Sequence, residues 1–157
     1  MSIKPIVTNI KELRQPCDLV IPSDDYKSII QDLKDTLATK NGVGLSANQI
    51  GINKKISYLK IPKGISKDKK IEYNESILIN AKIIEKDRPI QVRGESCLSF
   101  PGVSVITKRY VFITVTYLDE NLRERTGLFQ DLEAICVAHE IDHTNGLTIF
   151  DRKWRSK

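Results

Sequence analysis

Hydrophobic and polar positions alternate with two different periods along this chain. Between Ser23 and Lys40 the apolar residues recur every three or four positions, which predicts an amphipathic helix with Ser23 or Asp24 as its N-cap. Further along, the apolar stretches are shorter and rich in β-branched and aromatic residues, which is typical of strands. The predicted strands lie near Lys55–Leu59, Ile77–Ile84, Val111–Leu118 and Arg123–Phe129.

The segment that begins at Asp131 predicts a second helix, which is apolar on several faces and ends at Asn145–Gly146. A helix of this kind is buried rather than laid along a surface. We therefore expect an α+β fold, with antiparallel β-sheets surrounding this central helix and a further helix near the N-terminus, in a single domain spanning residues 1–157. Two histidines share one face of the central helix with Leu132, Ile135 and Cys136.

These two histidines, His139 and His143, are the only ones in the chain, and Glu140 lies between them. Four helical residues turn through about 400°, so both imidazoles project from nearly the same line and the carboxylate stands beside them. Such a pair can hold one metal ion, and the glutamate can reach a water molecule bound to that ion. The alternative is a solvated helix face, but histidines placed at random rarely fall into this arrangement.

The third ligand of such a site is not obvious from the sequence. Zinc peptidases with this motif usually draw it from a downstream Glu or His, but none of the fourteen residues after His143 is either. It must come from upstream, unless a carboxylate such as Asp151 supplies it. Cys136 lies about 10 Å from His143 along the helix axis, and Cys17 has few polar neighbours. Elimination favours Cys97, although a lone cysteine is more often a small buried hydrophobe.

A glycine-rich segment, Gly42–Gln49, formally matches the dinucleotide-binding fingerprint. That fingerprint must follow a strand and open a helix, whereas this segment follows the predicted helix that ends near Lys40. A helix C-cap and loop is the simplest alternative, but it leaves the uncharged run Ala47–Asn48–Gln49 unexplained.

Together these segments resemble the peptide deformylase family. Its members carry a Gly-x-Gly-hydrophobic-Ala-Ala-x-Gln segment, a Glu-Gly-Cys-hydrophobic-Ser segment and a His-Glu-x-x-His helix, in that order. The resemblance extends from about Arg14 to Asp151. Ser46 replaces an alanine, from which we expect little change, and Ser96 replaces a glycine, which would be strained if the backbone there needs a positive φ. The matching segments are Gly42–Gln49, Glu95–Ser99 and His139–His143.

The resemblance implies a metallohydrolase that removes the formyl group from the N-terminal formylmethionine of newly synthesised polypeptides and releases formate. The implied ligands of one divalent metal ion are Cys97, His139 and His143. We expect Fe²⁺ in the cell, with Zn²⁺, Ni²⁺ or Co²⁺ able to replace it, because a thiolate and two imidazoles suit all four ions.

The resemblance also assigns roles around the metal. Glu140 would activate the metal-bound water as a general base and then act as an acid. The side-chain amide of Gln49 and the backbone N–H of Leu98 would stabilise the oxyanion.

Substrate binding requires an apolar pocket for methionine. Glycines at 42 and 44 would let an extended peptide lie close to the backbone. Glu95 is expected beside this pocket. An ion pair between Glu95 and Arg109 would hold the Cys97 loop in place. The alternative is that both charged side chains lie on the surface. Ordinary core is the alternative for the aliphatic residues. The expected lining is Gly42, Val43, Gly44, Glu95, Leu132, Ile135 and Cys136.

Composition limits the setting of this activity. The chain is 40% hydrophobic and has no apolar run near the roughly 18 residues of a membrane span. Residues 1–6 lack the apolar block of a signal peptide and the Arg/Ser richness of a transit peptide, so we expect neither. Three cysteines argue against a disulfide framework. We expect a cytoplasmic enzyme, in a bacterium or in the host of a phage, which acts as a monomer on N-formylmethionyl nascent peptides without a membrane contact.

The net charge of +5 is concentrated between Lys54 and Lys70, around Pro62–Gly64. A solvated loop is the main interpretation, and a weak ribosome contact is the minority hypothesis. Charge without interleaved aromatic residues does not favour sequence-specific nucleic-acid binding.

Two other functions are compatible with the histidine motif. A zinc-dependent peptidase would use the same helix but lacks its usual downstream ligand. A non-catalytic structural metal-binding domain would close its site with four protein ligands and leave Glu140 without a role.

Overall fold

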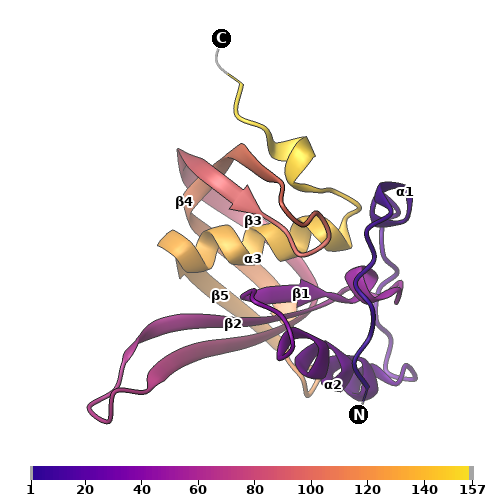
Figure 1. Ribbon diagram of the computed structural model, residues 1–157. Helices are drawn as coiled ribbons and strands as arrows, with labels where there is room; N and C mark the ends of the chain where they lie inside the picture. Colours follow the sequence, from indigo (N-terminus) through magenta and orange to yellow (C-terminus); the bar gives the residue numbers. More distant parts are fainter. Residues whose placement is uncertain (1, 156–157) are drawn as a thin grey trace.

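The computed structural model describes residues 2–155 (Figure 1). Over this range the strands form one antiparallel sheet in the order β1-β2-β3-β4-β5, which confirms the α+β prediction. The helices are α1 (Ile10–Leu13), α2 (Tyr26–Leu37) and α3 (Asp131–Thr144), with short 3₁₀ helices η1 (Ala47–Ile50) and η2 (Ile149–Arg152). The strands are β1 (Gly44–Ser46), β2 (Ile56–Ile65), β3 (Ile71–Ser96), β4 (Ser104–Leu118) and β5 (Glu124–Gln130).

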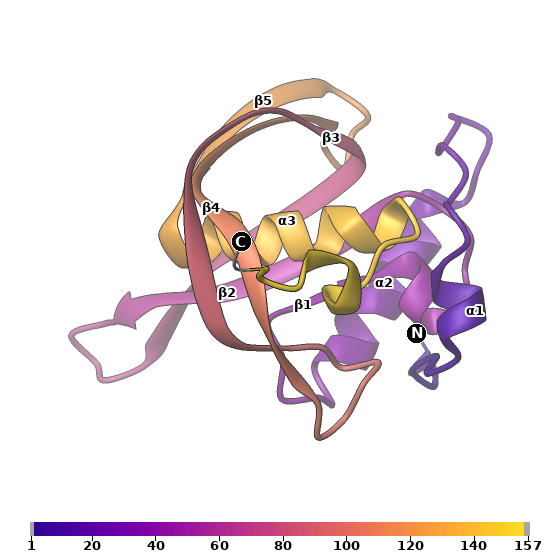
Figure 2. The same ribbon diagram turned by 90° about the horizontal axis from the view of Figure 1, so that it is seen from above.

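The sheet is strongly curved, and β3, β4 and β5 bend around α3 (Figure 2). Register shifts interrupt the pairing of β3 with β4 between Ile79 and Lys82, between Ile83 and Glu85, and between Val92 and Glu95. Such irregularities bend a strand and increase its twist. One long strand therefore leads from the far end of the sheet to the residues that precede Cys97.

The buried apolar side chains of the sheet and helices form two large clusters. One cluster joins α3 to the sheet, and the other joins α2 to the sheet. Each fully buried aliphatic side chain contributes about 1.5–3 kcal/mol by leaving water. The first cluster includes Leu59, Leu78, Val115, Val137 and Ile141, and the second includes Ile30, Leu33, Leu45, Ile56 and Ile79.

The N-cap of α2 is Asp25, so the prediction of Ser23 or Asp24 was wrong. The carboxylate of Asp24 is engaged elsewhere: it accepts from the backbone N–H of Ile21 at 2.9 Å and pairs with Lys54 at 2.9 Å. This tertiary ion pair is not visible in the local sequence.

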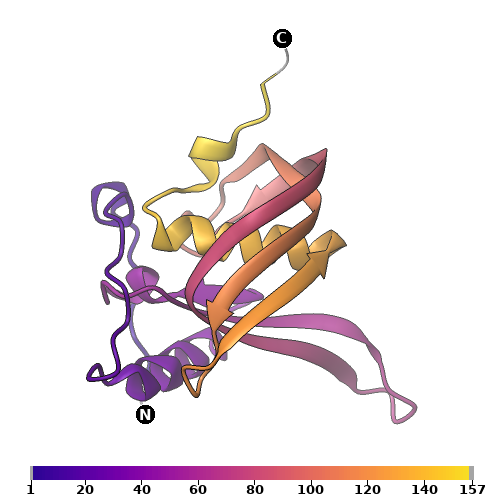
Figure 3. The same ribbon diagram turned by 180° about the vertical axis from the view of Figure 1, so that it is seen from behind.

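The lysine-rich segment is not a loop, as the sequence analysis expected, but a long hairpin. Strands β2 and β3 continue past the predicted ends at Leu59 and Ile77 and project beyond α3 (Figure 3). The chain turns at residues 66–70, and Pro62 and Gly64 flank an irregularity within the ladder. We refer to residues 60–76 as the hairpin arm. Most of its side chains are exposed, so it lacks the alternation that marks a half-buried strand.

The N-terminal segment crosses the end of α3. Cys17 donates its backbone N–H to the carbonyl of Thr144 at 3.0 Å. Gly146 has φ +76°, and a Cβ there would lie 2.6 Å from the carbonyl oxygen of Arg14, so only glycine fits this crossing. No helix within residues 2–155 is long and apolar enough to span a membrane.

Candidate metal centre

Three ligand atoms converge where the end of β3 meets α3. The Nε2 atom of His143 lies 3.2 Å from Cys97 Sγ and 3.2 Å from His139 Nε2. The three residues offer ligand atoms that all lie within 4.8 Å of one another. Ligands in a tetrahedral set, at about 2.0–2.3 Å from a cation, are themselves roughly 3.3–3.6 Å apart. The spacing therefore fits one metal ion.

The hydrogen bonding of His139 supports the same conclusion. Glu95 accepts from Nδ1 of His139 at 2.8 Å. Burial raises the pKa of Glu95, but hydrogen bonds from Arg109 and His139 outweigh it and hold the pKa well below its usual value, so the group is a carboxylate. With the proton of a neutral His139 ring on Nδ1, its Nε2 lone pair faces Nε2 of His143. A cation satisfies lone pairs that converge in this way.

A buried ion network supports Glu95. The predicted ion pair with Arg109 is present, with Nη2–Oε2 at 2.7 Å and Nε–Oε1 at 2.8 Å, and neither charge lies on the surface. Thr107 donates to the same carboxylate at 2.8 Å. Arg109 also pairs with Asp142 at 2.6 Å, and Asp142 pairs with Arg152 at 2.8 Å. Asp142 was not among the predicted site residues, because its contact with Arg109 depends on how β4 packs against α3.

Glu140 is buried next to the ligands, with 4% of its surface exposed. Its Oε1 accepts from the Ser46 hydroxyl at 2.9 Å, and its Oε2 lies 4.0 Å from His139 Nε2. Burial raises the pKa of Glu140, while the neighbouring His139 and the Ser46 hydrogen bond oppose this shift. A Cβ on Gly44 would lie 2.7 Å from Oε2, so the bare backbone of this glycine provides the space for the carboxylate.

The Gln49 amide has a fixed orientation. Its Oε1 accepts from the backbone N–H of Ser46 at 3.0 Å, and its Nε2 therefore points toward Ser99 Oγ at 3.1 Å and Cys97 Sγ at 3.5 Å. Asn48, which lies in the run that the loop interpretation left unexplained, donates to the carbonyl of His143 at 2.7 Å. Hydrogen bonds thus connect segment 42–49 to Cys97 and to α3, the two parts of the chain that supply the candidate ligands.

A cavity of about 490 Å³ opens beside these groups. Every residue expected to contact the substrate lies in its wall, together with both residues assigned to the oxyanion. Its lining includes Gly42, Val43, Gly44, Gln49, Glu95, Cys97, Leu98, Leu132, Ile135, Cys136, His139 and Glu140.

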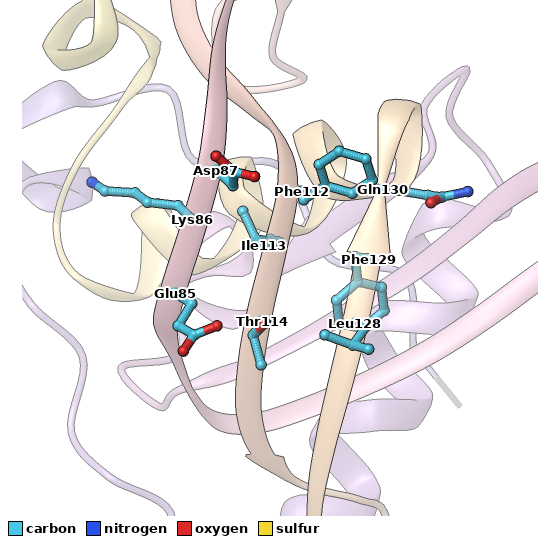
Figure 4. A pocket seen from close by; sticks show the side chains of 9 residues that line it. All are labelled: Glu85, Lys86, Asp87, Phe112, Ile113, Thr114, Leu128, Phe129 and Gln130. Carbon is cyan, nitrogen blue, oxygen red and sulfur yellow. The ribbon is translucent and has the colours of Figure 1, made fainter.

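A larger hollow of about 720 Å³ lies on β3, β4 and β5 (Figure 4). Charged residues of β3 stand on one side, and apolar residues of β4 and β5 on the other. Because none of the metal ligands lines this hollow, we take the smaller cavity as the candidate active site. The lining of the larger hollow includes Glu85, Lys86, Asp87, Phe112, Leu128 and Phe129.

The other candidate ligands lie outside the cluster. Asp151 pairs with Arg14 at 3.0 Å and accepts from the backbone N–H of Thr148. Burial raises the pKa of Cys17 to about 11 and that of Cys136 to about 12, so both are thiols at neutral pH.

The strain considered for residue 96 does not arise. The left-handed backbone conformation falls on Gly94, with φ +84°, and Ser96 is not among the residues with positive φ.

A cation site with three protein ligands, a buried carboxylate beside it and an adjoining apolar cavity define a metal-dependent hydrolase. The family model described as polypeptide deformylase matches residues 3–157. The chain therefore belongs to the peptide deformylase family, a placement that favours this activity over the peptidase and the structural metal domain.

Relatives and solved structures agree with this placement. The chain is 36% identical to a peptide deformylase of Microchaete diplosiphon, over 89% of this chain and 73% of that protein. It is 35% identical to peptide deformylase 2 of Clostridium perfringens, over 97% and 94%. The crystal structure of peptide deformylase from Ehrlichia chaffeensis superimposes with a TM-score of 0.86 at 31% identity, covering 98% of this chain and 89% of that one. The structure from Thermotoga maritima gives 0.86 at 28%, covering 99% and 100%.

Proposed function

We propose that this enzyme hydrolyses the N-terminal formyl group of formylmethionyl nascent polypeptides and releases formate. The observation that carries the proposal is the convergence of Cys97, His139 and His143 beside Glu140, next to a cavity of about 490 Å³ that Cys97, His139 and Glu140 line. The three residues hold the metal, for which we propose Fe²⁺ in the cell and Zn²⁺, Ni²⁺ or Co²⁺ as substitutes. When bound, a divalent ion lowers the pKa of a coordinated water from about 15.7 toward about 7.

Glu140 is the proton carrier in this proposal. Its Oε1 is occupied by the Ser46 hydroxyl, so Oε2, on the side of His139, is the oxygen that takes a proton. Burial disfavours the carboxylate form and makes it a stronger base than an exposed glutamate. The same atom then returns the proton to the departing amine.

Gln49 and Leu98 face the formyl oxygen. The Gln49 amide is held with Nε2 toward Cys97 Sγ and Ser99 Oγ, so the donor is oriented beside a proposed metal ligand before the substrate arrives. Leu98 lies in the same wall, and its backbone N–H is the second proposed donor. Losing one such donor typically costs about 10²–10³ in rate.

The peptide is proposed to bind along β1. Over residues 2–155, β1 pairs with β2 alone, so no strand pairs with its other edge. Gly42, Val43 and Gly44 line the cavity on this side. An extended peptide can add to such an edge as a further strand, and the methionine side chain then faces the apolar wall of α3. That wall comprises Leu132, Ile135 and Cys136.

The test is anaerobic purification with metal analysis, followed by formate release from formyl-Met-Ala-Ser. Replacing Glu140 with Ala should reduce turnover by about 10²–10⁴ while one metal ion per chain remains, since the substitution removes the proton carrier but none of the ligands. Cleavage of casein in place of the formylated peptide would instead identify a peptidase. Spectroscopy that shows a fourth protein ligand would identify a structural site.

We further propose that the enzyme works as a cytoplasmic monomer and that the lysines of the hairpin arm give it a weak contact with the ribosome. Binding through phosphate groups weakens steeply as salt rises. Co-sedimentation with ribosomes at 50 and 200 mM salt tests this, and affinity that is undetectable at both concentrations would reject the contact.

A further inference from the structure

Ser46 touches both groups that the proposed reaction uses. It lies where β1 joins η1 and is fully buried. Its backbone N–H donates to Gln49 Oε1 at 3.0 Å, and its Oγ lies 2.9 Å from Glu140 Oε1. The peptide deformylase motif has alanine at this position, and alanine could supply the backbone contact but not the hydroxyl.

A second buried hydroxyl backs the first. Ser57 is the cross-strand partner of Ser46 in the β1–β2 pair, and the two Oγ atoms are 2.8 Å apart. Within the described residues, Ser57 Oγ makes its side-chain hydrogen bond to Ser46 Oγ. Ser46 Oγ in turn has two acceptors of Glu140 within reach, the backbone carbonyl at 3.0 Å and Oε1 at 2.9 Å.

Counting protons gives the direction of this chain of hydroxyls. Each serine has one O–H proton and two lone pairs, and a carboxylate only accepts. If Ser57 donates to Ser46, the Ser46 proton is free for Glu140. In the opposite direction Ser46 would donate its proton to Ser57, and Ser46 Oγ would face Glu140 Oε1 at 2.9 Å with no hydrogen between the two oxygens. The carbonyl of residue 140 already lies inside α3, where the helix supplies a donor, so the carboxylate has the greater need.

The opposite side of the carboxylate is bounded by Gly44. A Cβ at this position would lie 2.7 Å from Oε2 and 3.1 Å from the Glu140 Cδ. The glycine opens space without filling it, so it cannot hold the side chain. The hydroxyl of Ser46 is the contact that distinguishes one carboxylate oxygen from the other.

We propose that Ser46 is a positioning residue for Glu140, and that Ser57 directs the Ser46 proton onto Oε1 so that Oε2 faces the reacting atoms. This inference rests on the proposed function. Neither serine lines the cavity, so both act through Glu140 and not through substrate.

The kinetic test compares two substitutions of equal size, Ser46→Ala and Ser57→Ala. Ser46→Ala should lower kcat for formyl-Met-Ala-Ser roughly 10- to 100-fold, as expected for a lost hydrogen bond to a charged group, with KM unchanged. Ser57→Ala, the matched control, should lower kcat only about 2- to 5-fold, because Ser46 still reaches the carboxylate. The double variant should match Ser46→Ala within about twofold, since Ser57 acts only through Ser46.

Two further measurements separate positioning from general damage. Metal content should equal that of the parent in all three variants, because the ligands are intact. A crystal structure of Ser46→Ala should show the Glu140 carboxylate in more than one orientation, and that of Ser57→Ala should show one. The crystal comparison does not depend on turnover.

Several outcomes would overturn the inference. These are an unmoved Glu140 with unchanged kcat in Ser46→Ala, losses in the two single variants that multiply in the double variant, or a fall in kcat that follows metal loss. Failure of the parent enzyme to release formate would reject the proposed function itself, a result distinct from any of these.

Discussion

The two ends of β3 lie in opposite environments. At the metal centre, Glu95 is buried, and its carboxylate accepts from Thr107, Arg109 and His139. At the hairpin arm, Ile71 is 55% exposed and its pairing partner Ile65 is 74% exposed. A buried carboxylate requires partners for its charge, while the arm is held mainly by its ladder of backbone hydrogen bonds. The same strand is therefore specified by side chains at one end and by the backbone at the other.

The sharpest way to test this contrast is to remove a charge from the buried end. Arg109→Ala leaves Glu95 and Asp142 without their shared cation, and breaking a buried pair in this way costs about 3–5 kcal/mol. We expect lower stability in urea unfolding and weaker metal retention on dialysis against a chelator. Arg125→Ala, which breaks the exposed pair with Asp119, is the control and should leave the unfolding midpoint and metal content unchanged. Unchanged metal content in Arg109→Ala would contradict the proposed support of the ligand loop.

A pair of glycine substitutions compares the same two regions sterically. Gly44→Ala places a methyl group against the Glu140 carboxylate, and displacing a reacting group by about 1 Å can cost about 10²-fold in kcat. Gly64→Ala, in the hairpin arm, meets no atom within 4 Å and should leave kcat within about twofold of the parent. Steady-state formate release measures both, and equal losses would remove the distinction between the regions.

The smallest effect is expected from reversing charges on the arm. Lys63, Lys67 and Lys70 are exposed, so changing all three to Glu should shift the melting temperature by less than about 4 °C. Turnover of formyl-Met-Ala-Ser should not change, because these residues do not line the catalytic cavity. A large loss of stability in calorimetry would show that the arm is held by its side chains after all.

The contrast also explains what could be predicted from the sequence. The helix that carries His139, Glu140 and His143 was predictable because their spacing and the apolar faces around them are local. Arg109 came from reasoning about charge near the Cys97 loop. The role of Asp142 depends on the register of β4 against β3 and α3, which no local pattern encodes.

Features that the sequence did not predict have similar physical causes. The hydrogen bond from Ser46 to Glu140, 94 positions away, was not predicted because Ser46 was compared with alanine by size alone. The strand of the arm was cut short because strand prediction relies on burial of one face, which the arm lacks. Asp24 does not cap α2, because its carboxylate forms a tertiary ion pair with Lys54.

The ligand order has a consequence for how the protein is made. When residues 2–130 have been synthesised, Cys97 and every strand of the described sheet are present, but neither imidazole is. Until α3 is synthesised, the aliphatic residues on the concave side of the sheet lack the helix against which they pack, so they are exposed to water or bound by a chaperone. Metal binding by all three residues therefore requires that α3 has been synthesised and has packed against the sheet.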